Sequence, residues 1–146
     1  MTAAGIGLLL IGGEGPARTV LEAILAQGPR IIAADSGFDL ACRLGVEPEL
    51  LVGDFDSVTD TPELRAFSAD RIRRYPPDKD ETDTEIGLRL FRELGVERVV
   101  LAGGGGGSLE HLVGILTLFE REQCPAAWYT AHEHVQAVAP AVVLEG

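Results

Sequence analysis

The chain has 146 residues, enough for one domain with its own hydrophobic core and too few for two ordinary domains. Hydrophobic residues make up 46% and charged residues 24%, which is typical of a soluble globular protein. The formal net charge of −11 argues against nucleic acid or an anionic membrane surface as a partner, because neutralising phosphates requires clustered Lys and Arg. A phosphate ligand would therefore need a metal ion and backbone amides to meet its charge.

The N-terminal residues, the lengths of the apolar runs and the two cysteines together predict a cytoplasmic location. Residues Met1 to Gly5 carry no Lys or Arg before the first apolar run, which argues against a signal peptide. No apolar run approaches the about 18 residues that a membrane span needs. Cys42 and Cys124 are far apart and have no metal-ligand spacing, so two free thiols in a reducing compartment are expected.

Strand-like and helix-like patterns alternate along the chain. Uninterrupted apolar runs ended by Gly, Pro or Asp predict strands, and apolar residues at helical spacing between capping and stop signals predict helices. Thr82-x-x-Glu85 is a capping box. In chain order, the predicted elements are a strand at 6–11, a helix from Pro16 to the Gly28-Pro29 stop, a strand at 31–34, a helix at 38–44, a strand at 50–52, a short helix at 62–67 capped by Asp60, an edge strand at 71–75, a helix from Thr82 to Gly95, a strand at 99–102, a helix at 109–122, a strand at 127–130, and two short alternating pieces at 135–138 and 142–144.

This alternation predicts an α/β fold, a Rossmann-like three-layer α/β/α arrangement with a mostly parallel sheet. In such sheets, ligands bind outside the carboxyl ends of the strands. Four polar or glycine-rich motifs follow predicted strands: Gly12-Gly13, Asp35-Ser36-Gly37, Gly53 to Ser57, and Gly103 to Ser108. The sequence therefore predicts a ligand site at this edge of the sheet.

The segment Gly53-Asp54-Phe55-Asp56-Ser57 carries the main chemical signal. Asp54 and Asp56 project to the same side of an extended chain, where two carboxylates repel unless a cation lies between them. Magnesium on nucleotide phosphates is the usual occupant of such an oxygen-only pair. A second acidic cluster, Asp78 to Asp83, opens a later helix and could close a Mg-nucleotide site.

Other interpretations of this segment are a solvated acidic turn, an EF-hand and a haloacid-dehalogenase-type phosphatase. An EF-hand fails, because counting from Asp54 its glycine and final acid positions hold Thr59 and Arg65. The phosphatase nucleophile motif looks similar, but that fold usually carries it on the first strand and needs a lysine further downstream. Lys79, the only lysine in the chain, is too close in sequence to fit comfortably.

The run of five glycines, Gly103 to Gly107, is either a flexible loop or a close approach of backbone to phosphate at a helix start. It lacks the Lys and Ser/Thr of a Walker loop. His111 is either a capping or solvated residue or part of the site. His132 and His134 flank Glu133, and a surface turn is favoured there over a metal site.

Taken together, these motifs resemble thiamine pyrophosphokinase. The resemblance covers nearly the whole chain, and it is carried by Ala34 to Gly37, Pro48 to Ser57, Asp80-Glu81-Thr82-Asp83, and Gly103 to His111. It implies transfer of a pyrophosphoryl group from ATP to the hydroxyl of thiamine, with Mg²⁺ as cofactor and AMP as the second product. The implied catalytic and metal-binding residues are Asp54, Asp56 and Asp83, and the implied nucleotide-binding residues are Asp35, Ser57, Lys79, Thr82, Gly104, Gly105, Ser108 and His111.

The resemblance also implies a division of the chain and a mode of assembly. Residues 1–131 would form the nucleotide-binding catalytic domain, and residues 132–146 the start or remnant of a C-terminal β domain. In the family that β domain helps to form the thiamine pocket across a dimer, so a homodimer is compatible with the resemblance. The apolar residues from Val135 to Leu144 suggest a partner surface, within the chain or between chains.

Two departures from the family pattern leave alternatives open. The family's glycine loop typically ends in Gly-Arg-x-Asp-His, whereas this chain has Gly107-Ser108-Leu109-Glu110-His111, so the cationic phosphate contact is lost. The chain also stops about where the β domain would begin. A pyrophosphokinase for another hydroxymethyl heterocycle such as a pterin, a phosphatase, and a nucleotide-binding module without turnover therefore remain alternatives.

Overall fold

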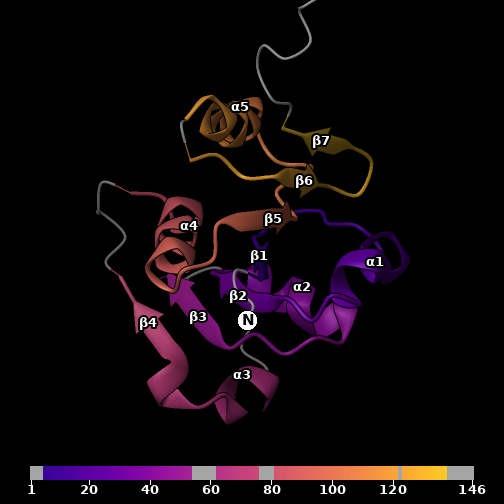
Figure 1. Cartoon of the computed structure of the whole chain (residues 1–146). Helices are drawn as coiled ribbons and strands as arrows, with labels where there is room; N and C mark the ends of the chain where they lie inside the picture. The colour runs from indigo at the N-terminus through magenta and orange to yellow at the C-terminus, as the bar shows by residue number, and fades with distance from the viewer. Residues whose placement is uncertain (1–4, 54–61, 76–80, 122, 138–146) are drawn as a thin grey trace, which may run out of the picture.

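The computed structural model describes residues 5–53, 62–75, 81–121 and 123–137. Within these residues the chain forms one seven-stranded sheet in the order β4-β3-β2-β1-β5-β6-β7. All neighbouring pairs from β4 to β6 are parallel, and only β7 pairs antiparallel, with β6. Helices α1 and α2 lie on one side of the sheet and α4 and α5 on the other (Figure 1). The predicted α/β/α fold with a mostly parallel sheet is confirmed.

The elements follow the predicted order closely. The strands are β1 (Ile6–Leu10), β2 (Arg30–Ala34), β3 (Leu50–Gly53), β4 (Ile72–Arg74), β5 (Arg98–Ala102), β6 (Ala127–Tyr129) and β7 (His134–Gln136). The α-helices are α1 (Glu22–Leu25), α2 (Gly37–Leu44), α3 (Pro62–Ala66), α4 (Asp83–Glu93) and α5 (Leu109–Thr117), and the short 3-10 helices are η1 (Arg18–Leu21), η2 (Ala69–Arg71) and η3 (Leu118–Glu120).

Strand β1 is the centre of the molecule, and all five of its residues are buried. Successive side chains point to opposite faces, so Leu8 and Leu10 enter the hydrophobic cluster beside α2, while Leu9 enters the cluster beside α4. Gly7 interrupts the apolar run for a packing reason. A Cβ at Gly7 would lie 2.9 Å from the ring of Phe91 on α4, so the glycine lets this helix approach the sheet closely.

Two predicted helices have different boundaries in the structure. The prediction that a helix starts at Pro16 is wrong, because Pro16 is buried, Ala17 is extended, and the first helical turn is η1. The prediction that a helix continues from 109 to 122 is also wrong: α5 ends at Thr117, the next turn is the 3-10 helix η3, and Arg121 is extended. Thr117 Oγ1 donates to the carbonyl of Gly114 at 2.7 Å, a local bond that competes with regular helical geometry.

The predicted edge strand and capping box are both present. β4 is the last strand on its side of the sheet, and Thr82 and Glu85 make both reciprocal bonds of the box at the start of α4. The first alternating piece of the tail forms β7, which belongs to the same sheet. Residues 142–144 and the proposed cap Asp60 lie outside the described residues, and the division after residue 131 stays a prediction.

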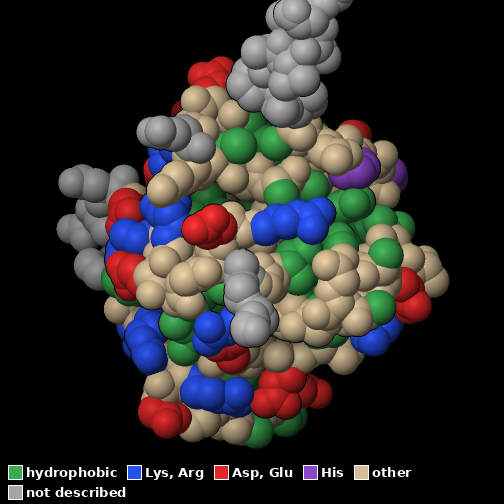
Figure 2. All heavy atoms as spheres, in the orientation of Figure 1, with side chains coloured by type: hydrophobic (Ala, Val, Ile, Leu, Met, Phe, Trp, Pro, Cys, Tyr) green, Lys and Arg blue, Asp and Glu red, His purple; other side chains and the backbone are tan. Residues whose placement is uncertain are grey.

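No helix among the described residues is long and apolar enough to cross a membrane. Cys42 and Cys124 form no disulfide. On the face seen in Figure 2, acidic and basic side chains are interspersed, and no basic patch of the kind that binds nucleic acid is visible there.

Candidate functional site

A cavity of about 350 Å³ lies at the carboxyl end of the sheet, where β1, β2 and the loop after β5 meet the start of α4. This is the edge at which the sequence predicted a ligand site. Four of the predicted site residues with side chains, Asp35, Thr82, Asp83 and His111, line this cavity together. The complete lining is Ile11, Gly12, Gly13, Ala34, Asp35, Ser36, Thr82, Asp83, Thr84, Gly105, Gly107 and His111.

Asp35 follows β2 in an unusual backbone conformation. Its φ of 51° is the only positive φ of a non-glycine residue in the described part of the chain. The backbone N–H of Asp35 donates to the carbonyl of Val52 on β3 at 2.7 Å, and the next turn presses Gly37 against β1. A Cβ at Gly37 would lie 2.1 Å from the carbonyl oxygen of Leu10, so only glycine fits. Residues with a strained backbone are often found at functional sites, and here the strained residue, Asp35, lines the cavity.

Gly53 lies between Asp35 and Asp83 at the end of β3. A Cβ at this position would lie 3.1 Å from Asp83 Oδ2 and 3.3 Å from Asp35 Cβ. The glycine also has a φ of 129°, which L side chains rarely adopt. The Oδ1 atoms of Asp35 and Asp83 are both buried from solvent. Two carboxylates therefore flank a small space that a glycine keeps open, directly before Asp54 in the sequence.

The start of α4 fixes the position of Asp83. Thr82 Oγ1 accepts the backbone N–H of Glu85 at 3.1 Å, and Glu85 Oε1 accepts the backbone N–H of Thr82 at 2.9 Å. Asp83 is the first residue of the helix, and the buried Thr84 follows it into the cavity wall. The first-turn amides and the positive end of the helix dipole lie at Asp83, and they favour an anion such as a phosphate, whereas the carboxylates favour a metal ion.

The glycine run is an ordered loop with close contacts on both sides. Gly103, Gly104 and Gly106 have positive φ values of 111°, 78° and 74°. Backbone bonds join Glu14 and Gly105 in both directions, at 2.8 and 3.0 Å. The loop therefore lies against the turn that follows β1.

The two glycines named as nucleotide-binding residues have different surroundings. Gly105 lines the cavity, whereas a Cβ at Gly104 would lie 2.8 Å from Ile115 and 2.9 Å from Ile11, in the core beneath the loop. The indole N–H of Trp128 donates to the carbonyl of Gly103 at 2.7 Å. The prediction did not include Trp128, although a tryptophan in a buried strand needs a partner for its N–H.

Ser108 and His111 lie at the start of α5. Ser108 Oγ accepts the backbone N–H of His111 at 3.2 Å, so Ser108 is the N-cap of this helix. The His111 side chain is exposed and lines the cavity, with its ring 3.6 Å from where a Cβ of Gly107 would lie. His111 is thus placed to reach a bound ligand, and Ser108 sets where α5 begins.

Several predicted site residues, namely Asp54, Asp56, Ser57 and Lys79, lie outside the described residues. Among the described residues, no three His, Cys, Asp or Glu side chains form a cluster that could hold a metal ion by themselves. Asp35 and Asp83 nevertheless fit one side of a magnesium site, because their carboxylate oxygens are the hard ligands that Mg²⁺ prefers. Ser36 and Thr84 also line the cavity and were not among the predicted site residues.

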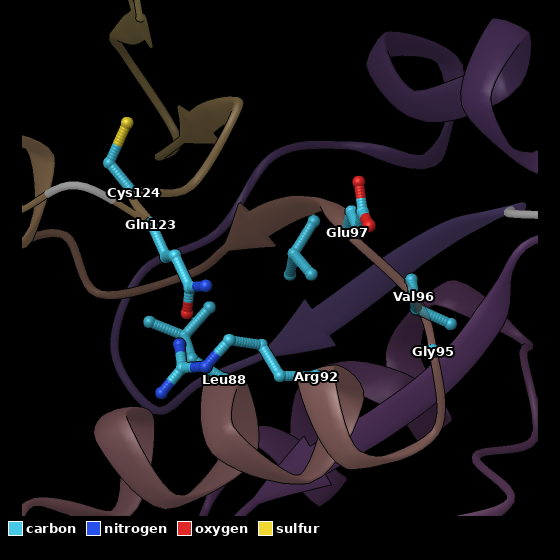
Figure 3. A pocket seen from close by; sticks show the side chains of 8 residues that line it. Leu88, Arg92, Gly95, Val96, Glu97, Gln123 and Cys124 are labelled. Carbon is cyan, nitrogen blue, oxygen red and sulfur yellow. The ribbon is translucent and has the colours of Figure 1, made fainter.

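A larger cavity, of about 440 Å³, lies at the opposite end of the sheet, between α4 and the start of β5 (Figure 3). Its lining includes Arg92 from α4, Glu97 before β5, and Gln123 and Cys124 before β6. The strained turns and glycine loops described above surround the other cavity. Position at the carboxyl end of the sheet, rather than size, therefore identifies the candidate site.

Comparison with known proteins indicates the family of this chain. The family model for the catalytic domain of thiamin pyrophosphokinase matches residues 21–127. The thiamine pyrophosphokinase of Bacillus subtilis (strain 168) is 30% identical over 88 residues, which are 60% of this chain and 41% of that protein.

Solved structures give the same result. A crystal structure of thiamin pyrophosphokinase from Geobacillus thermodenitrificans has a TM-score of 0.66 and 26% identity, over 86% of this chain and 59% of that one. The Bacillus subtilis enzyme structure has a TM-score of 0.72 over 90% of this chain and 63% of that one, and at 23% identity it supports the fold alone. This chain thus spans 41% to 63% of the length of these relatives. Since the family model covers most of it, the chain belongs to the thiamin pyrophosphokinase catalytic-domain family, a family of transferases.

Proposed function

We propose that this protein transfers the pyrophosphoryl group of ATP to the hydroxyl of thiamine, giving thiamine diphosphate and AMP. The observation that carries the proposal is the meeting of Asp35, Asp83, His111 and the glycine loop in one cavity at the carboxyl end of the sheet. This arrangement belongs to a chain whose family is the thiamin pyrophosphokinase catalytic domain.

In the proposed reaction, the thiamine hydroxyl oxygen attacks the β-phosphorus of ATP. The bond from the β-phosphorus to the bridging oxygen of the α-phosphate breaks, AMP leaves, and the hydroxyl proton passes to solvent. Mg²⁺ would neutralise charge on the phosphates, held by Asp83 together with Asp54 and Asp56. The protein contributes positioning and charge compensation rather than a covalent nucleophile.

The position of each described residue in the cavity suggests which part of the Mg-nucleotide it would contact. Asp83, and Asp35 opposite it across Gly53, would carry the acidic side of the site. Gly105 and Gly107 expose backbone in the cavity wall, where the chain can approach phosphates closely. Thr82, at the start of α4, and His111, near the start of α5, are polar side chains at helix N-termini, positions that favour an anion. Lys79 and Ser57 would add further nucleotide contacts.

The proposal extends to features that follow from the family. They are thiamine as acceptor, a cytoplasmic location, a homodimer, and a catalytic domain spanning residues 1–131. A nucleotide-binding protein without turnover is the second candidate, and Ser108 favours it, because a serine occupies the position where the family typically has an arginine. An acceptor of the pterin type is tested by the same assay.

The test measures AMP formation from ATP and Mg²⁺ with thiamine, with a hydroxymethyl pterin, and with no acceptor. AMP and thiamine diphosphate in equal amounts would support the proposal. Binding of ATP without AMP formation would favour the module without turnover. Release of inorganic phosphate from a generic phosphate ester would instead favour the phosphatase, and any of these other outcomes would contradict pyrophosphoryl transfer to thiamine.

A further inference from the structure

An ion pair joins the two helices beside the candidate site. Arg121 follows η3, just after α5, and its Nη2 donates to Glu85 Oε2 on α4 at 2.6 Å. The Arg121 side chain is 56% exposed and that of Glu85 is 19% exposed. The bond therefore joins the solvent-facing guanidinium of Arg121 to the largely buried carboxylate of Glu85.

Glu85 is also the residue that fixes the first turn of α4. Its other oxygen, Oε1, accepts the backbone N–H of Thr82 at 2.9 Å, and Asp83 follows Thr82 directly. The two carboxylate oxygens of Glu85 therefore accept hydrogen bonds from different partners. One closes the capping box, and the other is held by Arg121. Because a carboxylate is rigid and planar, fixing one oxygen restricts where the other can lie.

The space between the helices makes this bond more important. A cavity of about 300 Å³ is lined by residues from both sides, among them Glu110 and Gly114 of α5 and Glu85 of α4. It shares Thr82, Thr84 and His111 with the cavity of the candidate site, so the two adjoin. Because this volume is unfilled, α4 and α5 make fewer van der Waals contacts there. The polar bond between Arg121 and Glu85 then contributes more to fixing the two helices relative to each other.

We propose that Arg121 is a positioning residue for the Mg-nucleotide site. By holding Glu85, it fixes the first turn of α4, and with it the direction of the Asp83 carboxylate relative to His111 on α5. This inference rests on the proposed function, because it assigns Asp83 to the metal ion on the phosphates. Arg121 lines the adjoining cavity with Glu85 and does not line the site cavity, so it acts through Glu85 rather than on the substrate.

Isothermal titration calorimetry of ATP, with Mg²⁺ and with a chelator in its place, tests the proposal on the intact chain. Arg121→Gln should weaken ATP binding about threefold to fivefold in Mg²⁺, the upper part of the range of a partly exposed ion pair. Binding in chelator should stay unchanged, because only the metal-dependent part needs Asp83 in position. Arg121→Lys keeps a cation beside Glu85 and should recover most of the affinity.

Arg30→Gln is the matched control. Arg30 is the first residue of β2, at the opposite end of the sheet, and its Nη2 donates to Glu49 Oε2 at 2.8 Å, so its removal changes the net charge equally and breaks an ion pair away from the capping box. Its affinity for ATP in Mg²⁺ should stay within about twofold of the unchanged protein. A double-mutant cycle with Glu85→Gln should show that the effects of the two changes are not additive, since both remove one bond.

The outcomes separate the two proposals. If the unchanged protein binds ATP equally well with and without Mg²⁺, the proposed function falls, and this inference falls with it. If the unchanged protein needs Mg²⁺ but Arg121→Gln binds as tightly, only the positioning role is overturned. A loss of affinity that is the same in chelator, or that Arg121→Lys does not recover, would mean a purely structural role and would also overturn it.

Discussion

The indole N–H of Trp128 donates to the carbonyl of Gly103 at 2.7 Å, which links the middle of β6 to the first residue of the glycine loop. Trp128 is 3% exposed, and its Nε1 lies 3.3 Å from where a Cβ of Gly104 would be. The loop that forms one wall of the candidate site thus rests on a buried hydrogen bond from a neighbouring strand. This bond and the two backbone bonds between Glu14 and Gly105 support the run of five glycines.

Trp128→Phe should destabilise the protein and loosen the glycine loop. The change leaves the Gly103 carbonyl buried without this donor and removes ring volume, which together should cost about 2–4 kcal/mol of unfolding free energy. Urea denaturation followed by circular dichroism measures the loss. Affinity for ATP should fall as well, and unchanged stability and unchanged affinity would contradict the supporting role of the indole.

Gly53→Ala should disrupt the site more than the fold. The new Cβ would lie 3.1 Å from Asp83 Oδ2 and 3.3 Å from Asp35 Cβ, and a φ of 129° adds backbone strain. Gly95→Ala is the matched control, because Gly95 also has a positive φ, 84°, but no atom lies within 4 Å of its Cβ position.

Both glycine variants should lose unfolding free energy, on the order of 1 kcal/mol from strain alone. Only Gly53→Ala should lose Mg²⁺-dependent ATP binding, measured by calorimetry. Equal losses of binding in the two variants would show that stability, and not the space between the carboxylates, controls the site.

Much of the fold could be predicted because its signals are local. The apolar runs of β1, β2, β3 and β5 end at glycines or at Asp35, and a parallel sheet brings such ends together. The positions of Asp35 after β2 and of the glycine loop after β5 follow from that rule, whereas Asp83 reaches the same edge as the first residue of α4. The capping box of α4 was equally visible, since Thr82 and Glu85 are only three residues apart.

Contacts between distant residues could not be predicted. The first helical turn starts at Arg18, after the buried Pro16 and the extended Ala17, although local propensity favours proline as a first helical residue. The bond from Trp128 to Gly103 spans 25 residues and the bond from Arg121 to Glu85 spans 36. Both are set by how β6 and α5 pack, so the support of the glycine loop and of α4 became visible only in three dimensions.

The thiol of Cys42 should react slowly at neutral pH. Burial raises the pKa of Cys42 above its ordinary value of 9.0, and the carboxylates of Glu63 and Asp39 raise it further. Less thiolate is then present at any pH below the raised pKa, so alkylation slows. Mass spectrometry of iodoacetamide labelling in a Cys124→Ser background, followed as a function of pH, should give a midpoint above 9.0.

Glu63→Gln should lower that midpoint, because it removes one of the two carboxylates that oppose the thiolate. A midpoint below the ordinary value in the parent chain would contradict the burial and charge described around Cys42. No change in Glu63→Gln would leave burial and Asp39 as the causes.

Ser108→Arg should strengthen ATP binding while it weakens the fold. Ser108 caps α5 by accepting the backbone N–H of His111, and losing this cap should cost about 1 kcal/mol of stability. Ser108 lies between Gly107 and His111, which both line the cavity, so an arginine here could reach a phosphate.

Ser108→Ala loses the same cap without adding a cation and is the control. Relative to this control, Ser108→Arg should bind ATP about tenfold more tightly in Mg²⁺, since a hydrogen bond to a charged group contributes about 1.5 kcal/mol or more. Calorimetry measures the affinity and thermal unfolding the stability. Equal ATP affinity in the two variants would show that the phosphates do not lie against the start of α5, and the assignment of the glycine loop to the nucleotide would then be wrong.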